Sequence, residues 1–335
     1  MRPLFRNHLP GALTMQSWVI LFKAYLALAR PAHWNKNGFI LAGLLFGHGW
    51  SDPLLVRDAI TCFIGFCLVS SAVYAFNDVR DRDADRAHPG KCNRPVASGI
   101  LGVAGALLAA AIWAFAGIYL TGQVSISALV LTFLYIVMNL GYSLGLKHVV
   151  VLDVFIISAG FMLRILVGTL GVGIEPSRWL MFCGFMLTLF LGFAKRRAEL
   201  AAFQPGLRFD DPLLNPVDHQ APSKQPLVAI VPARRVLAAY SLPWLDRIIA
   251  ICAMGALVAY TAYTLDAGTV ALHGTERLVA TVPIVSYGIG RYLWTLYRHG
   301  LGADPATQMW RDPHLFASII CWLALTGWLI VERTA

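Results

Sequence analysis

Charged residues are scarce in this chain. Asp, Glu, Lys and Arg make up 13% of its 335 residues, whereas a soluble domain of this size carries about a quarter. Hydrophobic residues make up 58%, and the mean hydropathy is +0.64. The composition therefore excludes an ordinary soluble protein and predicts a polytopic membrane protein.

Cysteine is also sparse, and its spacing excludes two common uses. The six cysteines show neither the spacing of a metal site nor the density of a disulfide framework. Five of them lie inside apolar stretches, where we expect them to pack as small hydrophobic side chains.

Long apolar stretches account for most of the chain. A membrane-spanning helix needs roughly 20 apolar residues, and nine stretches approach this length: 37–50 (short, extended toward 55), 57–77, 100–121, 124–143, 150–172, 177–195, 245–265, 276–298 and 313–331. We therefore predict an all-α polytopic membrane protein with nine transmembrane helices. The stretch from Leu13 to Ala29 is broken by Lys23, which favours an interfacial helix.

The net charge of +9 raises the question of nucleic-acid binding. Membrane topology explains it better, because a cytoplasmic N-terminus with alternating spans places most Lys and Arg on the cytoplasmic side. The exceptions are Arg57, Arg178, Arg277 and Arg333, together with Arg164 inside a span. We therefore expect a multi-pass protein of the cell (inner) membrane with its N-terminus in the cytoplasm, and no nucleic-acid partner.

One polar stretch, 199–244, interrupts the apolar pattern with prolines and scattered charge, and it predicts a cytoplasmic loop. This stretch can be interpreted as an ordinary loop or as a lid over an active site, and the sequence does not decide between the two. The expected division is an N-terminal cytoplasmic or interfacial segment, 1–36, and a transmembrane domain, 37–335, with 199–244 as an insertion.

The motif Asn77-Asp78-x-x-Asp81-x-x-x-Asp85 directly follows an apolar run. On a helix, the spacing of Asn77, Asp81 and Asp85 places their side chains on one face. Their oxygens repel one another unless a cation joins them, and Mg²⁺ held by one or two carboxylates plus substrate phosphates is the usual solution. The motif therefore predicts an integral membrane enzyme, with Mg²⁺ as cofactor, that acts on a diphosphate. The alternative is a solvated helix end, in which Arg80, Arg82 and Arg86 form surface ion pairs.

Other polar residues collect at the expected cytoplasmic ends of the spans. Lys and Arg beside a Mg²⁺ site suit a diphosphate or a sugar phosphate, although interfacial anchoring explains such residues equally well. Asp153 and Arg164 are three helical turns apart and share a face. An ionisable residue inside a span is a candidate functional residue, with a structural ion pair as the alternative for Arg164. The candidates are Lys36, Asn37, Arg86, Lys91, Arg94, Tyr142, Lys147, Asp153, Arg164 and Lys195.

The Asp motif and Tyr142-Ser143-x-x-Leu146-Lys147 together resemble the UbiA superfamily of intramembrane prenyltransferases over roughly residues 30–330. The resemblance implies a helical bundle with a cytoplasm-facing cavity. It also implies that Asn77, Asp78, Asp81 and Asp85 hold Mg²⁺ and a diphosphate, with the three aspartates as catalytic metal ligands. One departure is that a second Asp-x-x-x-Asp motif is missing, since Asp153 is followed four residues later by Ile157.

A subgroup of that superfamily, the decaprenyl-phosphate phosphoribosyltransferases, is more similar. The similarity rests on Arg30-Pro31-x-x-Trp34-x-Lys36-Asn37, Asp85-Arg86-x-His88-Pro89-x-Lys91-x-x-Arg94-Pro95, Ser158-x-Gly160-Phe161-x-Leu163-Arg164 and Lys195-Arg196-x-Ala198-Glu199-Leu200. It implies transfer of 5-phosphoribose from phosphoribosyl diphosphate (PRPP) to a polyprenyl phosphate, for arabinose-containing cell-envelope precursors. Asn77 and the ten candidates above would bind the substrates.

Two alternatives belong to other classes. A prenyltransferase acting on an aromatic acceptor would need the second Asp pair. A transporter of anionic lipid or phosphate would explain a cationic cavity but not the complete Asp motif. The sequence leaves a homo-oligomer possible.

Overall fold

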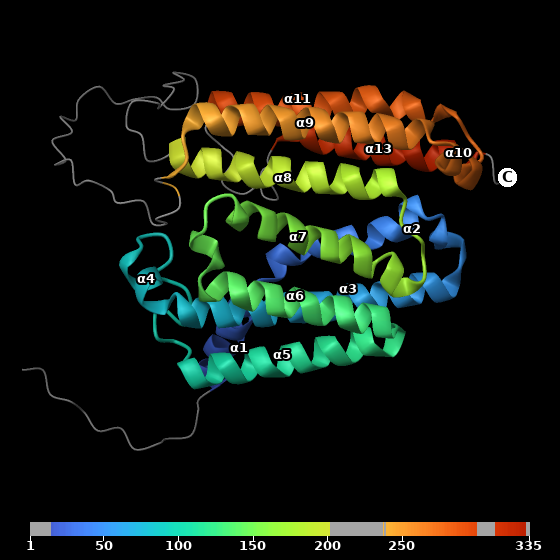
Figure 1. Cartoon of the computed structure of the whole chain (residues 1–335). Coiled ribbons are helices and arrows are strands. Elements are labelled where there is room, and N and C mark those ends of the chain that lie inside the picture. Colours follow the sequence, from blue (N-terminus) through green and yellow to red (C-terminus); the bar gives the residue numbers. More distant parts are fainter. Residues whose placement is uncertain (1–14, 202–236, 238, 300–311, 333–335) are drawn as a thin grey trace, which may run out of the picture.

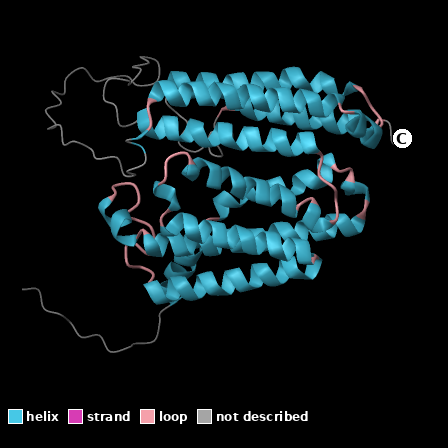
Figure 2. Ribbon diagram, in the orientation of Figure 1, coloured by secondary structure: helices cyan, strands magenta, loops and turns pink. Residues whose placement is uncertain are grey.

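The computed structural model describes residues 15–201, 237, 239–299 and 312–332, and within them the regular elements are all helical (Figure 2). The N-terminal half comprises α1 (Met15–Ala29), the 3₁₀ helix η1 (Pro31–Leu41), α2 (Ala42–Phe46), η2 (Gly49–Ser51), α3 (Pro53–Arg80), α4 (Arg82–Ala87), α5 (Val103–Val124), α6 (Ile126–Leu144), η3 (Leu146–His148), α7 (Leu152–Val167) and η4 (Leu170–Val172). The C-terminal half comprises α8 (Arg178–Ala201), α9 (Leu242–Leu265), α10 (Ala267–His273), η6 (Arg277–Thr281), α11 (Val282–His299) and α13 (Pro313–Val331). The long helices lie side by side, with α4 at one end of the bundle and α10 at the other (Figure 1).

Seven helices in the described residues are long and apolar enough to cross a membrane: Pro53–Arg80, Val103–Val124, Ile126–Leu144, Leu152–Val172, Arg178–Ala201, Leu242–Leu265 and Pro313–Val331. They correspond to seven of the nine predicted spans. The stretch 37–50 instead falls on η1, α2 and η2, and 276–298 falls on η6 and α11, so the count of nine is not confirmed. The chain is a multi-pass membrane protein.

The stretch 37–50 fails to form one long helix for identifiable reasons. Here η1 runs for 11 residues in 3₁₀ geometry, and the chain turns at His48, which has a left-handed φ of 55°. At Gly43 a Cβ atom would overlap the carbonyl oxygen of Gly168, because the backbone passes directly against the end of α7. Close backbone packing therefore takes the place of a regular span.

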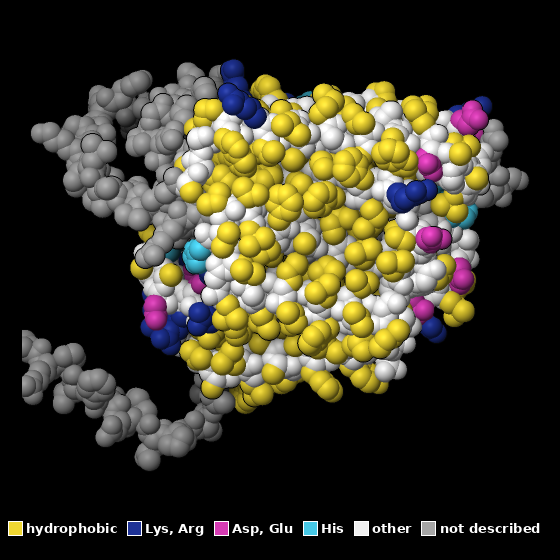
Figure 3. Space-filling view, in the orientation of Figure 1, with side chains coloured by type: hydrophobic (Ala, Val, Ile, Leu, Met, Phe, Trp, Pro, Cys, Tyr) yellow, Lys and Arg dark blue, Asp and Glu magenta, His cyan; other side chains and the backbone are white. Residues whose placement is uncertain are grey.

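Apolar side chains cover the flank of the bundle, whereas charged side chains gather near its two ends (Figure 3). The main buried clusters join α8 with α9 and α11, and α3 with α6, α7 and η1. The predicted segment before the first span forms α1, which exposes Trp18, Ile20 and Phe22 and buries Leu28. Its position in the bilayer interface stays a prediction, and most of the 199–244 insertion lies outside the described residues.

Candidate functional site

Asp78 is the buried centre of the site. It lies in the last turn of α3, and its Oδ1 accepts hydrogen bonds from Arg30 Nη2 at 2.5 Å and Arg94 Nη1 at 3.1 Å. Arg30 is held in a left-handed conformation (φ 54°) immediately before Pro31, and its guanidinium lies 5.1 Å from the centre of the Tyr74 ring. The turn between α1 and η1 thus brings a cation to the aspartate motif.

The helical path of the motif continues through a break at Asp81. The α3 helix ends at residue 80, but Asp81 N still donates to Asn77 O and Asp85 N to Asp81 O, both at 2.8 Å. Asn77 Oδ1 accepts from Ser143 Oγ at 3.2 Å, and Asp81 Oδ1 lies 2.6 Å from Lys147 Nζ. Asn77 and Asp81 therefore face the end of α6 and the turn that follows it.

The spacing of the motif predicts that Asp85 shares a face with Asn77 and Asp81. The structure instead groups it with another residue. Arg94 Nη1 lies 2.6 Å from Asp85 Oδ2, so Asp85 is grouped with Asp78 instead. The difference comes from Arg94, whose Nη1 atom contacts both Asp78 and Asp85. Surface ion pairs of the alternative kind do occur, but on Asp83, which pairs with Arg82 at 3.2 Å and Arg86 at 3.5 Å.

A cavity of about 420 Å³ opens beside these charges. Arg30, Asp78 and Arg94 contribute its polar wall, while Leu26 and Ala27 of α1 contribute an apolar wall. A cavity with cations on one side and an apolar helix on the other suits a molecule that has both a phosphate and a lipid chain.

The donor set of the motif suits Mg²⁺. Carboxylate and amide oxygens are the ligands that this ion prefers, and it commonly takes only one or two carboxylates along with water and substrate phosphates. No three His, Cys, Asp or Glu side chains within the described ranges converge as a ready-made metal cage. Instead, Arg30, Arg94 and Lys147 hold the three aspartates in place.

A second polar group lies deeper in the bundle. Arg164 is 5% exposed, and its guanidinium donates to Asn37 Oδ1, Gly160 O and Tyr135 OH at 2.8–2.9 Å. Asn37 in turn donates to Ser70 Oγ at 3.3 Å. These contacts tie η1 to α3, α6 and α7.

Asp153 belongs to a third group. Its Oδ2 accepts from Arg196 Nε at 2.6 Å and its Oδ1 from Tyr240 OH at 2.9 Å. Arg196 is fully buried, and its Nη2 also reaches Tyr142 OH at 3.4 Å. The ion pair between Asp153 and Arg196 joins α7 to α8, and Arg196 also connects both helices to Tyr142 of α6.

The remaining predicted residues are partly exposed. Lys36 lies on η1, Lys91 in the segment between α4 and α5, and Lys195 in the last two turns of α8. Arg86 Nε donates to Ala97 O at 2.9 Å. Sequence reasoning missed Arg30, Ser143, Arg196 and Tyr240. The first three belong to motifs described in the sequence analysis, so those motifs could have identified them. Nothing in the sequence distinguishes Tyr240.

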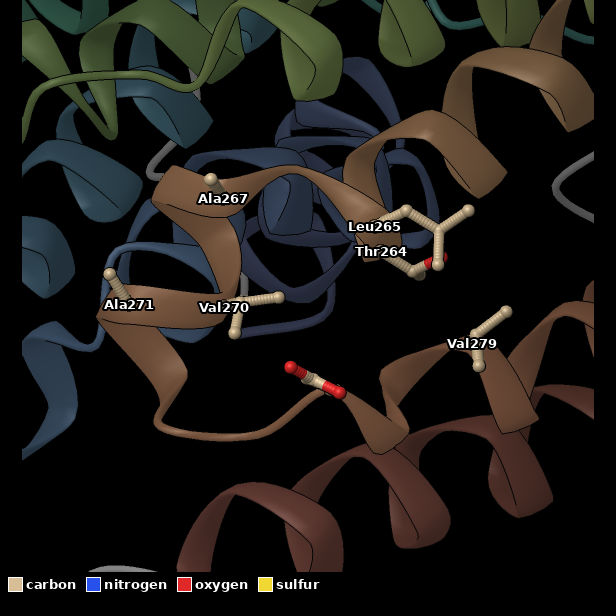
Figure 4. Close-up of a pocket in the computed structure, with 7 residues that line it drawn as sticks. Thr264, Leu265, Ala267, Val270, Ala271 and Val279 are labelled. Carbon is tan, nitrogen blue, oxygen red and sulfur yellow. The ribbon is translucent and has the colours of Figure 1, made fainter.

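A larger cavity, of about 590 Å³, lies at the opposite end of the bundle. Leu265, Val270 and Val279 point toward it from α9, α10 and η6 (Figure 4). Glu276 is the one charged side chain among the lining residues that the structure describes. Among the described residues that line it there is no cation for a phosphate, so the aspartate motif remains the candidate site.

The sequence profile of the UbiA prenyltransferase family matches residues 37–200, which include the whole aspartate motif. The chain belongs to this family. A solved UbiA homologue from Archaeoglobus fulgidus, bound to GPP and Mg²⁺, has a TM-score of 0.65 at 15% identity, and the match covers 92% of this chain and 99% of that one. That likeness shows the fold.

Several relatives are named decaprenyl-phosphate phosphoribosyltransferase. The chain is 28% identical to the Mycolicibacterium smegmatis protein over 311 residues, which cover 92% of each. It is 36% identical to the Corynebacterium glutamicum protein over 179 residues, 51% of this chain and 53% of the relative. The second match therefore spans only about half of either protein.

Proposed function

We propose that this protein transfers 5-phosphoribose from PRPP to a polyprenyl phosphate and releases diphosphate. The observation that carries the proposal is the convergence of Arg30, Arg94 and Lys147, from three separate segments, on the aspartate motif. PRPP has a diphosphate and a separate 5-phosphate, and the acceptor adds a third phosphate. Such substrates need several cations in one site. The relatives' names and the missing second aspartate motif favour the same reaction.

Asp78, Asp81 and Asp85 are the residues that would hold Mg²⁺, with Asn77 beside them. When bound, the ion supplies positive charge that stabilises the diphosphate leaving group. The cations that pair with these carboxylates would turn toward the phosphate oxygens once substrate is present. Arg94 suits this role, because its planar guanidinium has several donors in a fixed geometry.

The reaction needs no general base in this proposal. As the bond between ribose C1 and the diphosphate oxygen breaks, an oxocarbenium-like ribose forms. An oxygen of the polyprenyl phosphate, already ionised, then forms the new bond to C1. The contribution of the protein is to hold both substrates in position and to stabilise charge.

The predicted substrate-binding residues fall into two groups in this scheme. Asn77, Arg94 and Lys147 contact the motif or belong to it, which favours direct roles. Asn37 and Arg164 are bound to one another deep in the bundle, and this favours a supporting role. Direct contacts to phosphate remain proposals for Lys36, Arg86, Lys91 and Lys195, and supporting roles for Tyr142 and Asp153.

The topology is part of the proposal. The motif and the turn after α6 lie at the same end of the bundle (Figure 1), which we place in the cytoplasm with residues 1–36, because PRPP is water-soluble and intracellular. Residues 37–335 would form the membrane domain of the inner membrane. The lipid acceptor would enter from the bilayer, and a homo-oligomer is compatible with this arrangement.

The test is an assay on membranes that contain the protein, with radiolabelled PRPP, a polyprenyl phosphate and Mg²⁺. We expect label in the lipid phase only when all three are present. Asp81→Asn should abolish transfer, whereas Asp58→Asn, the same change at the far end of α3, should not. Prenyl transfer to an aromatic acid in place of phosphoribosyl transfer would overturn the proposal. Phosphate transport without diphosphate release would also overturn it.

A further inference from the structure

The turn that carries Lys147 contains no fully buried residue, although Val151 at its end packs against the core. This turn, residues 145–151, joins α6 to α7, and no residue from 144 to 152 is buried. Lysine has a long flexible side chain, so the place of its ammonium group depends on where the backbone holds it. The contact of 2.6 Å between Lys147 and Asp81 therefore needs another source of order.

The end of the turn adopts an unfavourable backbone conformation. Val151 has φ 67° and ψ −46°, and Leu152 N donates to Val150 O at 2.8 Å. This is a γ-turn of the rare, strained kind. A β-branched residue such as valine is especially unsuited to positive φ. Such a conformation persists only where surrounding contacts fix it.

Tyr240 supplies those contacts from a segment almost ninety residues away. Its hydroxyl accepts a hydrogen bond from Val151 N at 2.7 Å and donates one to Asp153 Oδ1 at 2.9 Å. Asp153 is itself fixed by Arg196 at 2.6 Å. One hydroxyl thus holds the backbone of the strained residue and the first turn of α7.

The tyrosine is suited to this task. It is 7% exposed, and its ring lies 5.7 Å from that of Trp244. Burial raises the pKa of Tyr240 above its usual value, and the neighbouring Asp153 carboxylate acts in the same direction. The hydroxyl therefore keeps its proton and remains a donor to Asp153.

We propose that Tyr240 is a positioning residue, which acts through the 145–151 turn to hold Lys147 against Asp81. Backbone hydrogen bonds between near neighbours connect Asp153 to the residue before Lys147. Asp153 N donates to Val149 O at 3.1 Å, and Val149 N donates to Leu146 O at 3.1 Å. The effect of Tyr240 on catalysis rests on the proposed function, whereas its effect on the position of Lys147 does not.

The first experiment measures Lys147 directly and uses no substrate. The full-length protein in detergent is treated briefly with an amine-acetylating reagent, and modification of Lys147 is followed by peptide mass spectrometry. In Tyr240→Phe, which keeps the ring and removes the hydroxyl, Lys147 should be modified about three- to tenfold faster, the factor typical of one lost hydrogen bond. Tyr263→Phe, the same change near the other end of α9, should leave Lys147 unchanged.

Unchanged Lys147 labelling in Tyr240→Phe would overturn the proposal. Lys195 on α8 provides the internal reference, and an equal rise there would indicate general loosening and would equally overturn it. If Tyr240→Phe does not fold, Asp153→Asn replaces it, because this change weakens the same anchor from the other side. The expected rise in Lys147 labelling is then the same in direction.

The second experiment is a double-mutant cycle in the transfer assay. Tyr240→Phe should raise the KM for PRPP about three- to tenfold in the wild-type background. In a Lys147→Gln background the same change should have little further effect, because residues that act through one another are not additive. Additive effects would contradict a role through Lys147. A wild-type protein without phosphoribosyl transfer would refute the proposed function and leave the labelling result standing.

Discussion

Asp78 and Asp85, seven residues apart in the motif, are joined through one nitrogen of Arg94. The Nη1 atom lies 3.1 Å from Asp78 Oδ1 and 2.6 Å from Asp85 Oδ2. The two carboxylates would repel each other without this shared donor. The segment after α4 therefore controls how the acidic side chains are arranged.

Replacing Arg94 by lysine should impair the enzyme although the charge is kept. The planar guanidinium presents several donors in fixed directions, which a lysine ammonium on a flexible chain does not reproduce. Under the proposed role of Asp78 and Asp85 as metal ligands, we expect kcat/KM to fall about 10- to 100-fold, the usual effect of removing a group that orients such ligands. Arg57→Lys, at the opposite end of α3, is the matched control. Equal activity of Arg94→Lys and wild type would show that charge alone suffices.

Gly168 should be far less tolerant of alanine than Gly38. A Cβ atom on Gly168 would overlap the carbonyl oxygen of Ile40, whereas no atom lies within 4 Å of the corresponding position at Gly38. Gly168→Ala should lower the free energy of unfolding by about 1–3 kcal/mol or more, the usual range for overpacking. Thermal unfolding in detergent measures the difference. Similar midpoints for the two variants would refute the close backbone approach between η1 and α7.

Much of the fold follows from hydropathy, but the site follows only in part. Seven predicted spans coincide with long helices because apolar length is a strong signal. The stretch 37–50 was predicted as a span, but its conformation depends on contacts with residues distant in the sequence, such as Gly43 against Gly168. The structure pairs the three aspartates of the motif with cations, and their role as metal ligands stays a prediction. The motif could not reveal which residues would pair, since Arg30 and Lys147 reach Asp78 and Asp81 from distant segments.

Tyr240 illustrates what sequence patterns cannot provide. It follows a polar stretch, and no motif includes it. Its importance comes from a hydrogen bond to the backbone of Val151, 89 residues away in the sequence. Contacts to backbone atoms leave no characteristic residue type at the other end, so a single sequence carries no trace of them.

Arg164 is expected to contribute to stability through its polar contacts. Its guanidinium meets Asn37, Tyr135 and the carbonyl of Gly160. Arg164→Met should leave these groups without their partner and lower the free energy of unfolding by about 1–3 kcal/mol for each group that stays unsatisfied. Arg57→Met, at an exposed position, is the control for thermal unfolding in detergent. Equal stability of the two variants would mean that the contacts of Arg164 do not stabilise the fold.

His273 predicts a pH dependence of stability. It ends α10, outside the seven candidate spans, and is 3% exposed. Burial lowers the pKa of its imidazole below the ordinary value, and the nearby His48 lowers it further. At this position the unfolded chain therefore takes up a proton as the pH falls below about 6.5, while the folded protein takes it up only at a lower pH. The contribution of His273 to stability should be constant above that pH and should decrease below it.

The comparison that isolates His273 is with His273→Gln, which lacks the titrating group but still offers a hydrogen bond to Tyr263, the partner of His273 Nε2 at 3.0 Å. Unfolding midpoints in detergent are measured from pH 8 to pH 5. The variant should be less stable than wild type at pH 8 and should lose less on acidification, so the two curves approach each other. Parallel curves would assign the acid sensitivity to other groups, because stability is lost on acidification only through groups that bind protons more readily in the unfolded state.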